Sequence, residues 1–395
     1  MNNILPLMQD LDVKGKRVLL RVDFNVPLDK EGHITDDTRL KETAPTILWL
    51  LDHGASIILL SHLGRPKKPD PSLSLRVCVE PLEKILKHKV TFSTDISATQ
   101  NLKPGDIFLM ENLRFYPAEE KPETDPEFTK KLASLGDIYI NDAFGTAHRA
   151  HSSTALIAKF FPQKKGAGFL MQKEIENLST LLKNPKTPFF AIIGGAKVSS
   201  KLGVLKSLIE KVDAFFIGGG MAYTFFKAKG ISIGNSIVEP ELIEEANLFL
   251  DACKKNKIPV FLPEDLLIAD SFANEAKTQV VDADQGIPEN WQGMDIGPKT
   301  LKHWQNELTK AKTVFWNGPV GVFEFASFGK GTLGIAKTLS SLKATTIVGG
   351  GDSVAAISQA GLNQKFTHIS TGGGASLEYL EFGKLPGIET LKESS

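Results

Sequence analysis

Short apolar runs alternate with longer amphipathic stretches along nearly the whole chain. The runs are rich in Val, Ile, Leu and Phe, and near-continuous runs of this kind are typical of strands buried on both faces of a parallel sheet. Ten runs predict strands, at 17–24, 56–62, 106–111, 137–144, 189–195, 214–220, 259–265, 313–319, 345–351 and 368–374. Amphipathic stretches between them predict helices, among them 45–54, 83–89, 174–184 and 242–256. The alternation predicts an α/β fold with two doubly wound domains.

The length of 395 residues supports two domains, because single hydrophobic cores stop growing near ~250–300 residues. A boundary is expected near 162–170, where Pro, Lys and Gly gather before a long helical pattern. The predicted domains are therefore 1–167 and 168–375.

The residues that follow the predicted strands differ between the two halves. In open α/β sheets, ligands bind beyond the carboxyl ends of the strands, so these positions are the informative ones. First-half strands end in polar and charged residues: Asp23, Asn25, His62, Arg65, Glu111, Asn112, Arg114, Asn141 and Asp142. Second-half strands end in glycine, at 194–195, 218–220, 349–351 and 372–374. The pattern predicts an anion-binding edge in the first domain and a nucleotide-binding edge in the second.

Composition narrows the class of protein. The chain is 42% apolar and 23% charged, with 46 basic and 46 acidic residues, as in an ordinary globular protein. This balance gives no reason to expect a nucleic-acid or membrane partner. No signal peptide, membrane helix or C-x-x-C pattern is found, so we expect a reduced, cytoplasmic enzyme.

The arginines are confined to one half. All seven lie at or before Arg149, and the rest of the chain carries lysine only. Planar guanidinium groups bind small anions in a bidentate manner, whereas lysine acts as a point charge. We therefore expect anion recognition by arginine in the first domain and by lysine in the second.

The stretch GTAHRAHSS, residues 145–153, is open to three interpretations. A metal site would need a third ligand beside His148 and His151. A serine hydrolase would need a nucleophile elbow, G-x-S-x-G, which is absent. An anion clamp needs only Arg149 to share a pocket with Arg39, Arg65 and Arg114, and it agrees with the neighbouring strand ends. In that interpretation the two histidines are packing residues.

Three second-half motifs suit a nucleotide. In GGAKVSSK, residues 194–201, the spacing of Lys197 and Lys201 places both ammonium groups on one face of a predicted helix. In GGGDS, residues 349–353, Asp352 could hold a nucleotide-bound Mg²⁺ and Ser353 could lie near a phosphate. In WNGPVGVFE, residues 316–324, the Glu324 carboxylate suits ribose hydroxyls. No Walker A loop is present.

Nine motifs together resemble the phosphoglycerate kinase family, in order and from end to end. They are RVDFNVP, SHLGRP, ENLRF, FGTAHRAHSS, GGAKVSSK, GGGMAYTF, WNGPVGVFE, GGGDS and STGGGAS. The resemblance implies two Rossmann-like domains joined by a hinge, with the segment 376–395 returning to pack on the first. It also implies a monomer, with Mg²⁺ as cofactor, that transfers a phosphoryl group from 1,3-bisphosphoglycerate to ADP and gives 3-phosphoglycerate and ATP.

The resemblance assigns site residues position by position. The implied phosphoglycerate site comprises Asp23, Asn25, Arg39, His62, Arg65, Arg114 and Arg149. The implied nucleotide site comprises Gly194, Lys197, Lys201, Gly218, Gly219, Gly293, Asn317, Glu324, Gly350, Gly351, Asp352 and Ser353, with Asp352 at the metal. Catalysis falls to Arg39, Lys197 and the amides of Gly372 and Gly373. Two departures from the family pattern, Ser200 and LEFGKLPG (380–387), leave a helix cap and the C-terminal packing open.

The implied chemistry needs no general base, because the acceptor carboxylate is already ionised near neutral pH. Catalysis then reduces to positioning and charge neutralisation, with domain closure to exclude water.

Two other classes of protein agree less well with the sequence. An NAD-dependent dehydrogenase would need G-x-G-x-x-G after a strand, with an acidic residue ~20 positions on, and no convincing instance is found. A solute-binding protein that clamps an anion would have no use for the lysine–glycine half.

Overall fold

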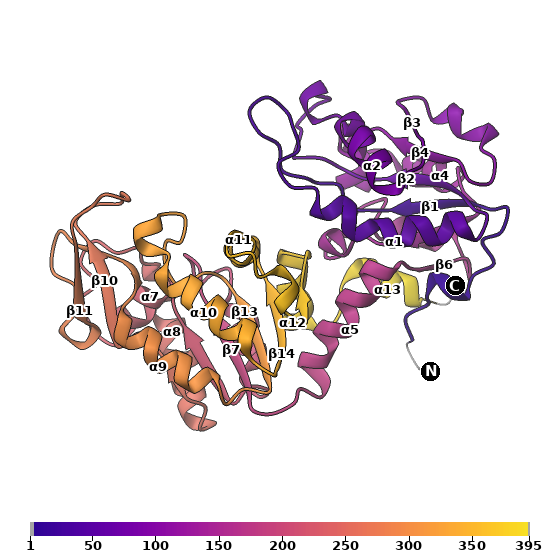
Figure 1. Ribbon diagram of the computed structural model, residues 1–395. Coiled ribbons are helices and arrows are strands. Elements are labelled where there is room, and N and C mark those ends of the chain that lie inside the picture. The colour runs from indigo at the N-terminus through magenta and orange to yellow at the C-terminus, as the bar shows by residue number, and fades with distance from the viewer. Residues whose placement is uncertain (1–3, 394–395) are drawn as a thin grey trace. The chain divides into compact units, whose positions relative to one another are not determined.

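The computed structural model describes residues 4–393, apart from the side chains of residues 96 and 97. Its contacts divide the chain into two compact units (Figure 1). The N-terminal unit comprises Met1–Glu176 and Lys384–Ser395, and the C-terminal unit comprises Asn177–Gly383. Each unit is built around a six-stranded sheet, and every strand pair in these two sheets is parallel. The predicted fold class is confirmed.

The sheet of the N-terminal unit has the strand order β3-β4-β2-β1-β5-β6. Its strands are β1 (Arg17–Arg21), β2 (Ser56–Leu60), β3 (Val90–Ser93), β4 (Ile107–Met110), β5 (Ile138–Asn141) and β6 (Lys165–Ala167). Every residue of β2, β4 and β5 is buried, as their continuous apolar sequences predict.

Helices cover this sheet because each presents an apolar face to it. The helices of the unit are α1 (Thr38–Asp52), α2 (Val79–Leu86), α3 (Pro117–Glu120), α4 (Pro126–Ala133), α13 (Pro386–Lys392) and most of α5 (Phe169–Lys183). Leu40, Ile47 and Leu50 of α1 recur at helical spacing and pack in one core with Val18 and Leu20 of β1.

The chain returns to the N-terminal unit near its C-terminus, as predicted, but later than predicted: it does so from Lys384 onward, whereas residues 376–383 belong to the C-terminal unit. Gly387 at the start of α13 donates its N–H to the carbonyl of Ala147, at 2.8 Å. A Cβ atom at position 387 would meet Ala147 and Thr154 at 3.0–3.2 Å, so the close approach of the two backbones favours glycine. The altered LEFGKLPG sequence therefore still docks, because Gly387 makes the contact.

The sheet of the C-terminal unit has the order β15-β14-β13-β7-β8-β9. Its strands are β7 (Phe189–Ile193), β8 (Ala214–Ile217), β9 (Val260–Phe261), β13 (Thr313–Asn317), β14 (Thr345–Gly349) and β15 (His368–Ile369). The helices are α6 (Leu202–Leu208), α7 (Ala222–Ala228), α8 (Ile243–Lys255), α9 (Pro298–Leu308), α10 (Lys330–Ser341), α11 (Gly351–Gln359) and α12 (Gly374–Phe382).

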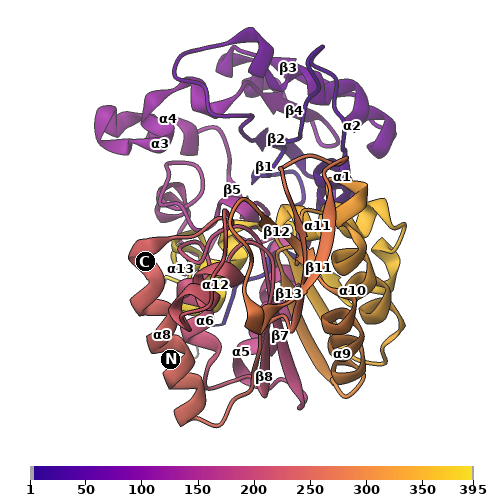
Figure 2. The ribbon, with the colours of Figure 1, turned by 90° about the vertical axis from the view of Figure 1, so that its left-hand side faces the viewer.

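Both faces of this sheet are covered. Figure 2 shows α6 and α8 on one side of the strands and α9 and α10 on the other. Trp304 of α9 and Trp316 of β13 are fully buried in the core on the second side. Phe249 of α8 packs against Phe215 of β8, with ring centroids 5.1 Å apart.

A three-stranded antiparallel sheet in the C-terminal unit was not predicted. It has the order β11-β10-β12, from Asp265–Ala269, Thr278–Asp282 and Gln292–Ile296 as β10, β11 and β12. Continuous apolar runs were the signal for a strand, whereas β11 is almost entirely exposed and β12 begins with polar residues. Likewise β3 and β6 lie at the edges of their sheet, and neither has a long apolar run.

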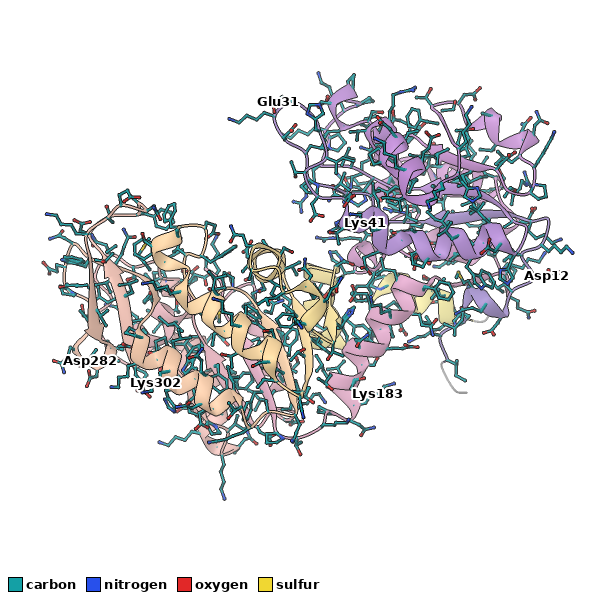
Figure 3. All side chains as sticks on the ribbon, viewed as in Figure 1. Asp12, Glu31, Lys41, Lys183, Asp282 and Lys302 are labelled. Carbon is teal, nitrogen blue, oxygen red and sulfur yellow. The ribbon has the colours of Figure 1, made fainter. Side chains whose placement is uncertain are left out.

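The ten predicted strands are all present, but most end several residues earlier than predicted. The polar and glycine residues at their carboxyl ends are loops, which is the arrangement a ligand site requires. Charged side chains cover the exterior, as Asp12, Lys41 and Lys302 illustrate (Figure 3). Among residues 4–393, no helix combines the length and apolar character needed to cross a membrane.

A buried leucine of α9 should contribute far more to stability than an exposed leucine of α8. Leu308 is fully buried in the core, whereas Leu248 is 53% exposed. Leu308→Ala should lower the free energy of unfolding by about 2–5 kcal/mol, because it leaves a cavity. Leu248→Ala should change it by about 0.5 kcal/mol or less. Urea unfolding followed by tryptophan fluorescence measures both, and equal losses would contradict the packing described for α9.

Candidate functional site

The charged residues predicted in the first half gather at one edge of the N-terminal sheet. Because the strands are parallel, their carboxyl ends meet there: Asp23 follows β1, His62 follows β2, Arg114 follows β4 and Arg149 follows β5. Arg39 reaches the same edge from the first turn of α1. The structure thus brings together all seven residues predicted for the phosphoglycerate site. We call this set, Asp23, Asn25, Arg39, His62, Arg65, Arg114 and Arg149, the arginine cluster.

Asp23 and Arg39 form the central ion pair of the cluster. Arg39 Nη1 donates to Asp23 Oδ2, and the Asp23 side chain is only 8% exposed. Burial by itself would raise the pKa of Asp23, but the charges of Arg39 and Arg21 and the Asn25 amide lower it to about 2. Asp23 is therefore a carboxylate that accepts hydrogen bonds.

Side chains of the cluster tie the strand-end loops to one another. Asn25 Oδ1 accepts from the Gly64 amide at 2.8 Å, and Arg114 Nη1 donates to the Gly64 carbonyl at 2.6 Å. Gly64 has a positive φ of 64°, and a Cβ atom there would press on Leu73. Hydrogen bonds to the main chain of Gly64 thus link the loops that follow β1, β2 and β4.

Arg114 forms its ion pair with Glu120 and not with Glu111, which is nearer in the sequence. Arg114 Nε lies 3.1 Å from Glu120 Oε1. Glu111 instead accepts from the Ser74 hydroxyl at 2.7 Å and from the Leu75 amide at 3.0 Å. Glu111 directly follows β4, and its carboxylate caps a turn in the segment after β2.

His62 is neutral and its tautomer is defined. Its side chain is buried, and burial, with nearby arginines, holds its pKa well below the usual value. Arg21 Nη2 lies 3.2 Å from His62 Nδ1. A guanidinium has no acceptor, so Nδ1 accepts and the ring proton lies on Nε2. His62 can therefore donate a hydrogen bond to an anion.

Two arginines remain uncommitted. The exposed guanidinium groups of Arg65 and Arg149 form no hydrogen bond or ion pair within residues 4–393. Burial, together with neighbouring arginines, lowers the pKa of His148 and of His151 to about 4. Both histidines are thus neutral, and the free positive charge of GTAHRAHSS is that of Arg149. In the described part of the chain, no three His, Cys, Asp or Glu residues are grouped to hold a metal ion.

In the C-terminal unit, the glycines after the strands let three loops touch backbone to backbone. Gly194 and Gly195, after β7, donate to the carbonyls of Asn317 and Pro319 at 2.9 and 2.8 Å. Gly219, after β8, donates to the Val320 carbonyl at 3.0 Å and has a φ of 67°. A Cβ atom at position 194 would collide with the Pro319 carbonyl. Because glycine has no side chain, the main chain itself forms this sheet edge, and a nucleotide can approach it closely.

The predicted helical placement of Lys197 and Lys201 was wrong. Residues 194–201 form turns, and α6 begins only at Leu202, with Lys201 as its N-cap residue. Ser200, the departure from the family pattern, closes the turn by donating its hydroxyl to the Lys197 carbonyl at 3.0 Å. Turn residues such as serine compete with helix formation by bonds of this kind, which explains the difference. The exposed Lys197 ammonium makes no bond with a described residue.

Lys201 points into the site. Its Nζ donates to Asn317 Oδ1. Burial lowers the pKa of Lys201, while the nearby Asp352 carboxylate opposes that shift. The buried Nδ2 of Asn317 has no hydrogen-bond partner, and positions 349 and 350 lie next to it. A donor is thus left unsatisfied beside the amino end of α11.

The two helices that follow β14 and β15 start with glycine. Gly350 (φ 89°) is the N-cap residue of α11, and Gly373 (φ 54°) is that of α12. Neither helix has a side-chain cap, so their first amides are available to an anion. Within α11, Ser353 Oγ accepts from the Gly318 amide at 2.7 Å, whereas Asp352 is exposed. Gly372 is buried and donates to Ser370 Oγ at 3.1 Å.

The remaining nucleotide-site residues lie farther along the same unit. Gly293 of β12 has the ring of Tyr223 against it, which leaves no room for a Cβ atom. Gly218 lies against Val320 in the same way. Glu324 is exposed and makes no bond with a described residue. The structure gives no ligand contact for these positions, and their roles stay predictions.

Sequence reasoning missed the buried layer beneath the arginine cluster. Arg21 is 1% exposed, and Glu119 and Ser153 lie beside it, equally buried. Arg21 was counted among the arginines, but nothing in a single sequence separates a buried arginine at a strand end from an exposed one.

The site residues would fit a magnesium ion carried by a nucleotide. Mg²⁺ prefers one or two protein carboxylates together with phosphate oxygens and water. Asp352, exposed at the first turn of α11 and near Lys201, is a suitable carboxylate. The amides of α11 and the Lys201 ammonium would hold the phosphates beside it.

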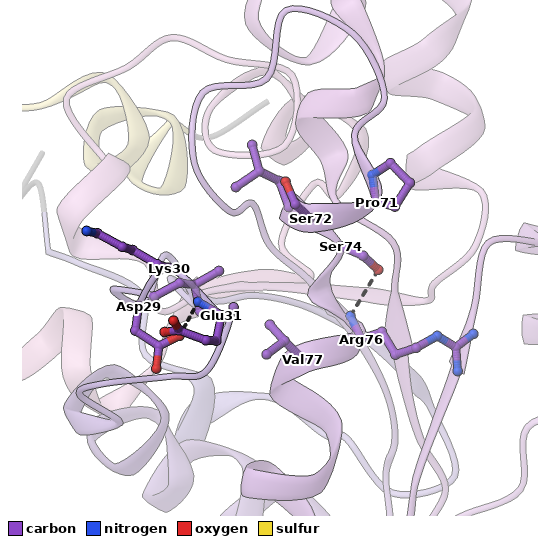
Figure 4. Close-up of a pocket in the computed structure, with 11 residues that line it drawn as sticks. Asp29, Lys30, Glu31, Pro71, Ser72, Ser74, Arg76 and Val77 are labelled. Atoms are coloured by element: carbon purple, nitrogen blue, oxygen red, sulfur yellow. Dashed lines mark hydrogen bonds between the residues drawn. The ribbon is translucent and has the colours of Figure 1, made fainter.

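The N-terminal unit also has a surface hollow of about 640 Å³ (Figure 4). Asp29, Lys30 and Glu31 line one side of it, and Ser72 and Arg76 line the other. None of the predicted site residues lines the hollow, so it is not part of the candidate site.

The low pKa of Asp23 predicts that the folded protein loses stability as the pH falls. Its folded pKa of about 2 lies below the ordinary value of 3.8, so the stabilisation is complete above that value and is lost as pH falls toward 2. Between pH 5 and pH 3, the loss from this group should be about 1 kcal/mol. Asp23→Asn should remove that part of the pH dependence in urea unfolding. An unchanged pH dependence would contradict the Asp23–Arg39 pair.

Comparisons with known proteins agree with this geometry. A family profile described as "Phosphoglycerate kinase" matches residues 8–384. The chain is 50% identical to the cytosolic phosphoglycerate kinase of Nicotiana tabacum and 51% identical to the phosphoglycerate kinase of Leptospira biflexa, with 98% of each chain covered in both comparisons. The structure of phosphoglycerate kinase from Coxiella burnetii matches with a TM-score of 0.89 at 39% identity, covering 98% of this chain and 99% of that one. The chain belongs to the phosphoglycerate kinase family.

Proposed function

We propose that this chain catalyses the phosphoglycerate kinase reaction, in glycolysis and in its reverse. A phosphoryl group passes from 1,3-bisphosphoglycerate to ADP, giving 3-phosphoglycerate and ATP. Family membership supports this function directly. The observation that carries it here is the contrast between the two sheet edges: one is lined with guanidinium groups and the other with main-chain amides and lysine.

The arginine cluster suits phosphoglycerate. The free guanidinium groups of Arg65 and Arg149 can bind the phosphate in bidentate fashion. The Asp23 carboxylate and the Asn25 side chain can bond the substrate hydroxyl, and the Nε2–H of His62 can donate to an anionic oxygen. Arg39 keeps donors beyond the one it gives to Asp23, and we assign them to the acceptor carboxylate and the transferring group.

The second edge suits ADP and ATP. The amides at the start of α11, the Lys201 ammonium and the unsatisfied Asn317 Nδ2 are donors for the phosphates. Lys197 is exposed and makes no bond with a described residue, so it can accompany the transferring phosphoryl group, with the Gly373 amide assisting. The Gly372 amide is assigned the same role, for which it has to leave its bond to Ser370 Oγ. Gly218, Gly219, Gly293 and Glu324 are assigned to the adenosine.

The chemistry is positioning and charge neutralisation. In the direction of ATP use, the nucleophile is the ionised carboxylate of 3-phosphoglycerate, so no residue has to remove a proton. Arg39 and Lys197 would offset the charge that develops on the equatorial oxygens. Bound Mg²⁺ would neutralise phosphate charge in the same way, held by Asp352.

Closure of the two domains remains a step of this proposal, because the acceptor and the nucleotide have to meet with water excluded. We also propose that the chain acts in the cytoplasm, since relatives from tobacco and wheat are named cytosolic. The family resemblance further leads us to propose a monomer.

The function is tested by trapping the acyl phosphate. Purified protein is incubated with ATP, Mg²⁺ and 3-phosphoglycerate in hydroxylamine, and hydroxamate is measured. Hydroxamate should form only when all three are present. If none forms while nucleotide binding is intact, the assignment of the acceptor is wrong.

Arg39→Ala should lower kcat on the order of 10²-fold or more and weaken nucleotide binding little, because Arg39 neutralises charge in the transition state. Lys201→Ala is the contrasting variant and should mainly raise the KM for nucleotide. Steady-state kinetics with both substrates measures these effects. Since Arg39→Ala leaves Asp23 unpaired, circular dichroism has to show a folded protein. A near-normal kcat for Arg39→Ala would exclude the role, and an effect of Lys201→Ala on phosphoglycerate alone would contradict the division of labour.

A further inference from the structure

A chain of buried hydrogen bonds runs beneath the arginine cluster, from Glu119 to His62. Ser153 Oγ lies 2.5 Å from Glu119 Oε1, and the Ser153 amide lies 3.0 Å from Glu119 Oε2. Arg21 Nε lies 2.7 Å from the same Ser153 Oγ, and Arg21 Nη2 lies 3.2 Å from His62 Nδ1. All four side chains are at most 2% exposed. Only His62, at the end of this chain of bonds, has been assigned to substrate.

The direction of every bond in the chain is fixed by chemistry. Arg21 can only donate, so Ser153 Oγ accepts from it. The one hydroxyl proton of Ser153 then goes to Glu119, whose second oxygen accepts the Ser153 amide. Arg21 also donates to the Val22 carbonyl, so its guanidinium is held at three positions. Its remaining Nη2–H bond requires His62 Nδ1 to be unprotonated.

The charges are also matched. An arginine held in the interior needs a counter-charge, because burying an unpaired cation is costly. Asp23 and Glu119 are the two buried carboxyl groups whose pKa the charge of Arg21 acts to lower, and Asp23 is already paired with Arg39. Burial raises the pKa of Glu119, and the charge of Arg21 opposes that shift. Glu119 is thus the remaining counter-charge for Arg21, linked to it through Ser153.

We propose that Glu119 is a positioning residue for the phosphoglycerate site: through Ser153 and Arg21, it holds His62 in the tautomer that carries its proton on Nε2. The two serines of GTAHRAHSS therefore have different functions. Ser152 donates to the Ala118 carbonyl at 2.6 Å and accepts from Thr129 at 2.9 Å, and its hydroxyl contacts neither Arg21 nor Glu119. Ser152 holds the α3 segment in place through its bond to Ala118. Ser153 instead links Glu119 to Arg21, which contacts His62.

The adjacent serines provide a matched test. Glu119→Gln keeps the shape of the side chain, but its amide cannot accept both Ser153 donors. Ser153→Ala removes the bridge to Arg21. Ser152→Ala is the control, because it deletes an equally buried hydroxyl outside the chain of bonds. Ring nitrogens are followed by ¹⁵N NMR of the full chain labelled at histidine, with His62 assigned from a His62→Asn spectrum.

In the wild-type protein, His62 should show an unprotonated Nδ1 and a protonated Nε2. Glu119→Gln and Ser153→Ala should move the two shifts toward each other, because the tautomers mix, whereas Ser152→Ala should leave them unchanged. If Ser153→Ala does not fold, the isosteric Glu119→Gln decides the test. The proposal is overturned if His62 carries its proton on Nδ1, if Glu119→Gln leaves the ring unchanged, or if Ser152→Ala changes it equally.

A second measurement rests on the proposed function. The dissociation constant for 3-phosphoglycerate should rise roughly 10-fold in Glu119→Gln and Ser153→Ala, because a charge-assisted bond is misdirected. Affinity for ATP should not change. If the wild-type protein fails to bind 3-phosphoglycerate, the proposed function fails, but the NMR result still decides whether Glu119 positions His62. Tautomer mixing without a change in affinity would overturn the role in substrate binding.

Discussion

Parallel pairing of strands buried on both faces determines where chemistry can occur in this protein. Apolar side chains fill both faces of each sheet, so polar residues are left to the loops beyond the strand ends. Because the strands run in one direction, these loops meet at a single edge of each sheet. Residues as distant in the sequence as Arg21 and Asn141, which pair at the ends of β1 and β5, are neighbours for that reason.

Positive charge is concentrated at the N-terminal sheet edge, and the surrounding residues reduce the repulsion between these like charges. His62, His148 and His151 lie among arginines and are held neutral by burial and by those arginines. Asp23 and Glu120 pair with Arg39 and Arg114. Glu119 compensates Arg21 from below. The exposed guanidinium groups of Arg65 and Arg149 bond to none of the residues that the structure describes, and they are the charges available to a phosphate.

The C-terminal edge uses main chain in place of arginine. Its loops approach so closely that several positions admit no Cβ atom, as at Gly194 and Gly219. The exposed amides at the start of α11 and α12 supply partial positive charge, and Lys197 and Lys201 supply whole charges. A planar guanidinium binds a small anion in one fixed geometry. Main-chain amides and the flexible lysine side chains can instead follow a polyphosphate whose length changes during the reaction.

The sequence by itself determined the α/β class, ten strands of the two six-stranded sheets and the loops that carry the candidate residues, because most of these strands are buried on both faces and leave a continuous apolar signal. The order of the nine motifs along the chain was also sufficient to indicate the family. Only the tertiary structure decided that 194–201 is a run of turns, that Arg114 pairs with Glu120, and that Arg21, Ser153 and Glu119 support His62. The last of these features depends on a contact between two residues that lie 132 positions apart, Arg21 and Ser153. The local sequence around either residue does not reveal such a contact, because the packing of the folded chain determines which distant residues become hydrogen-bond partners.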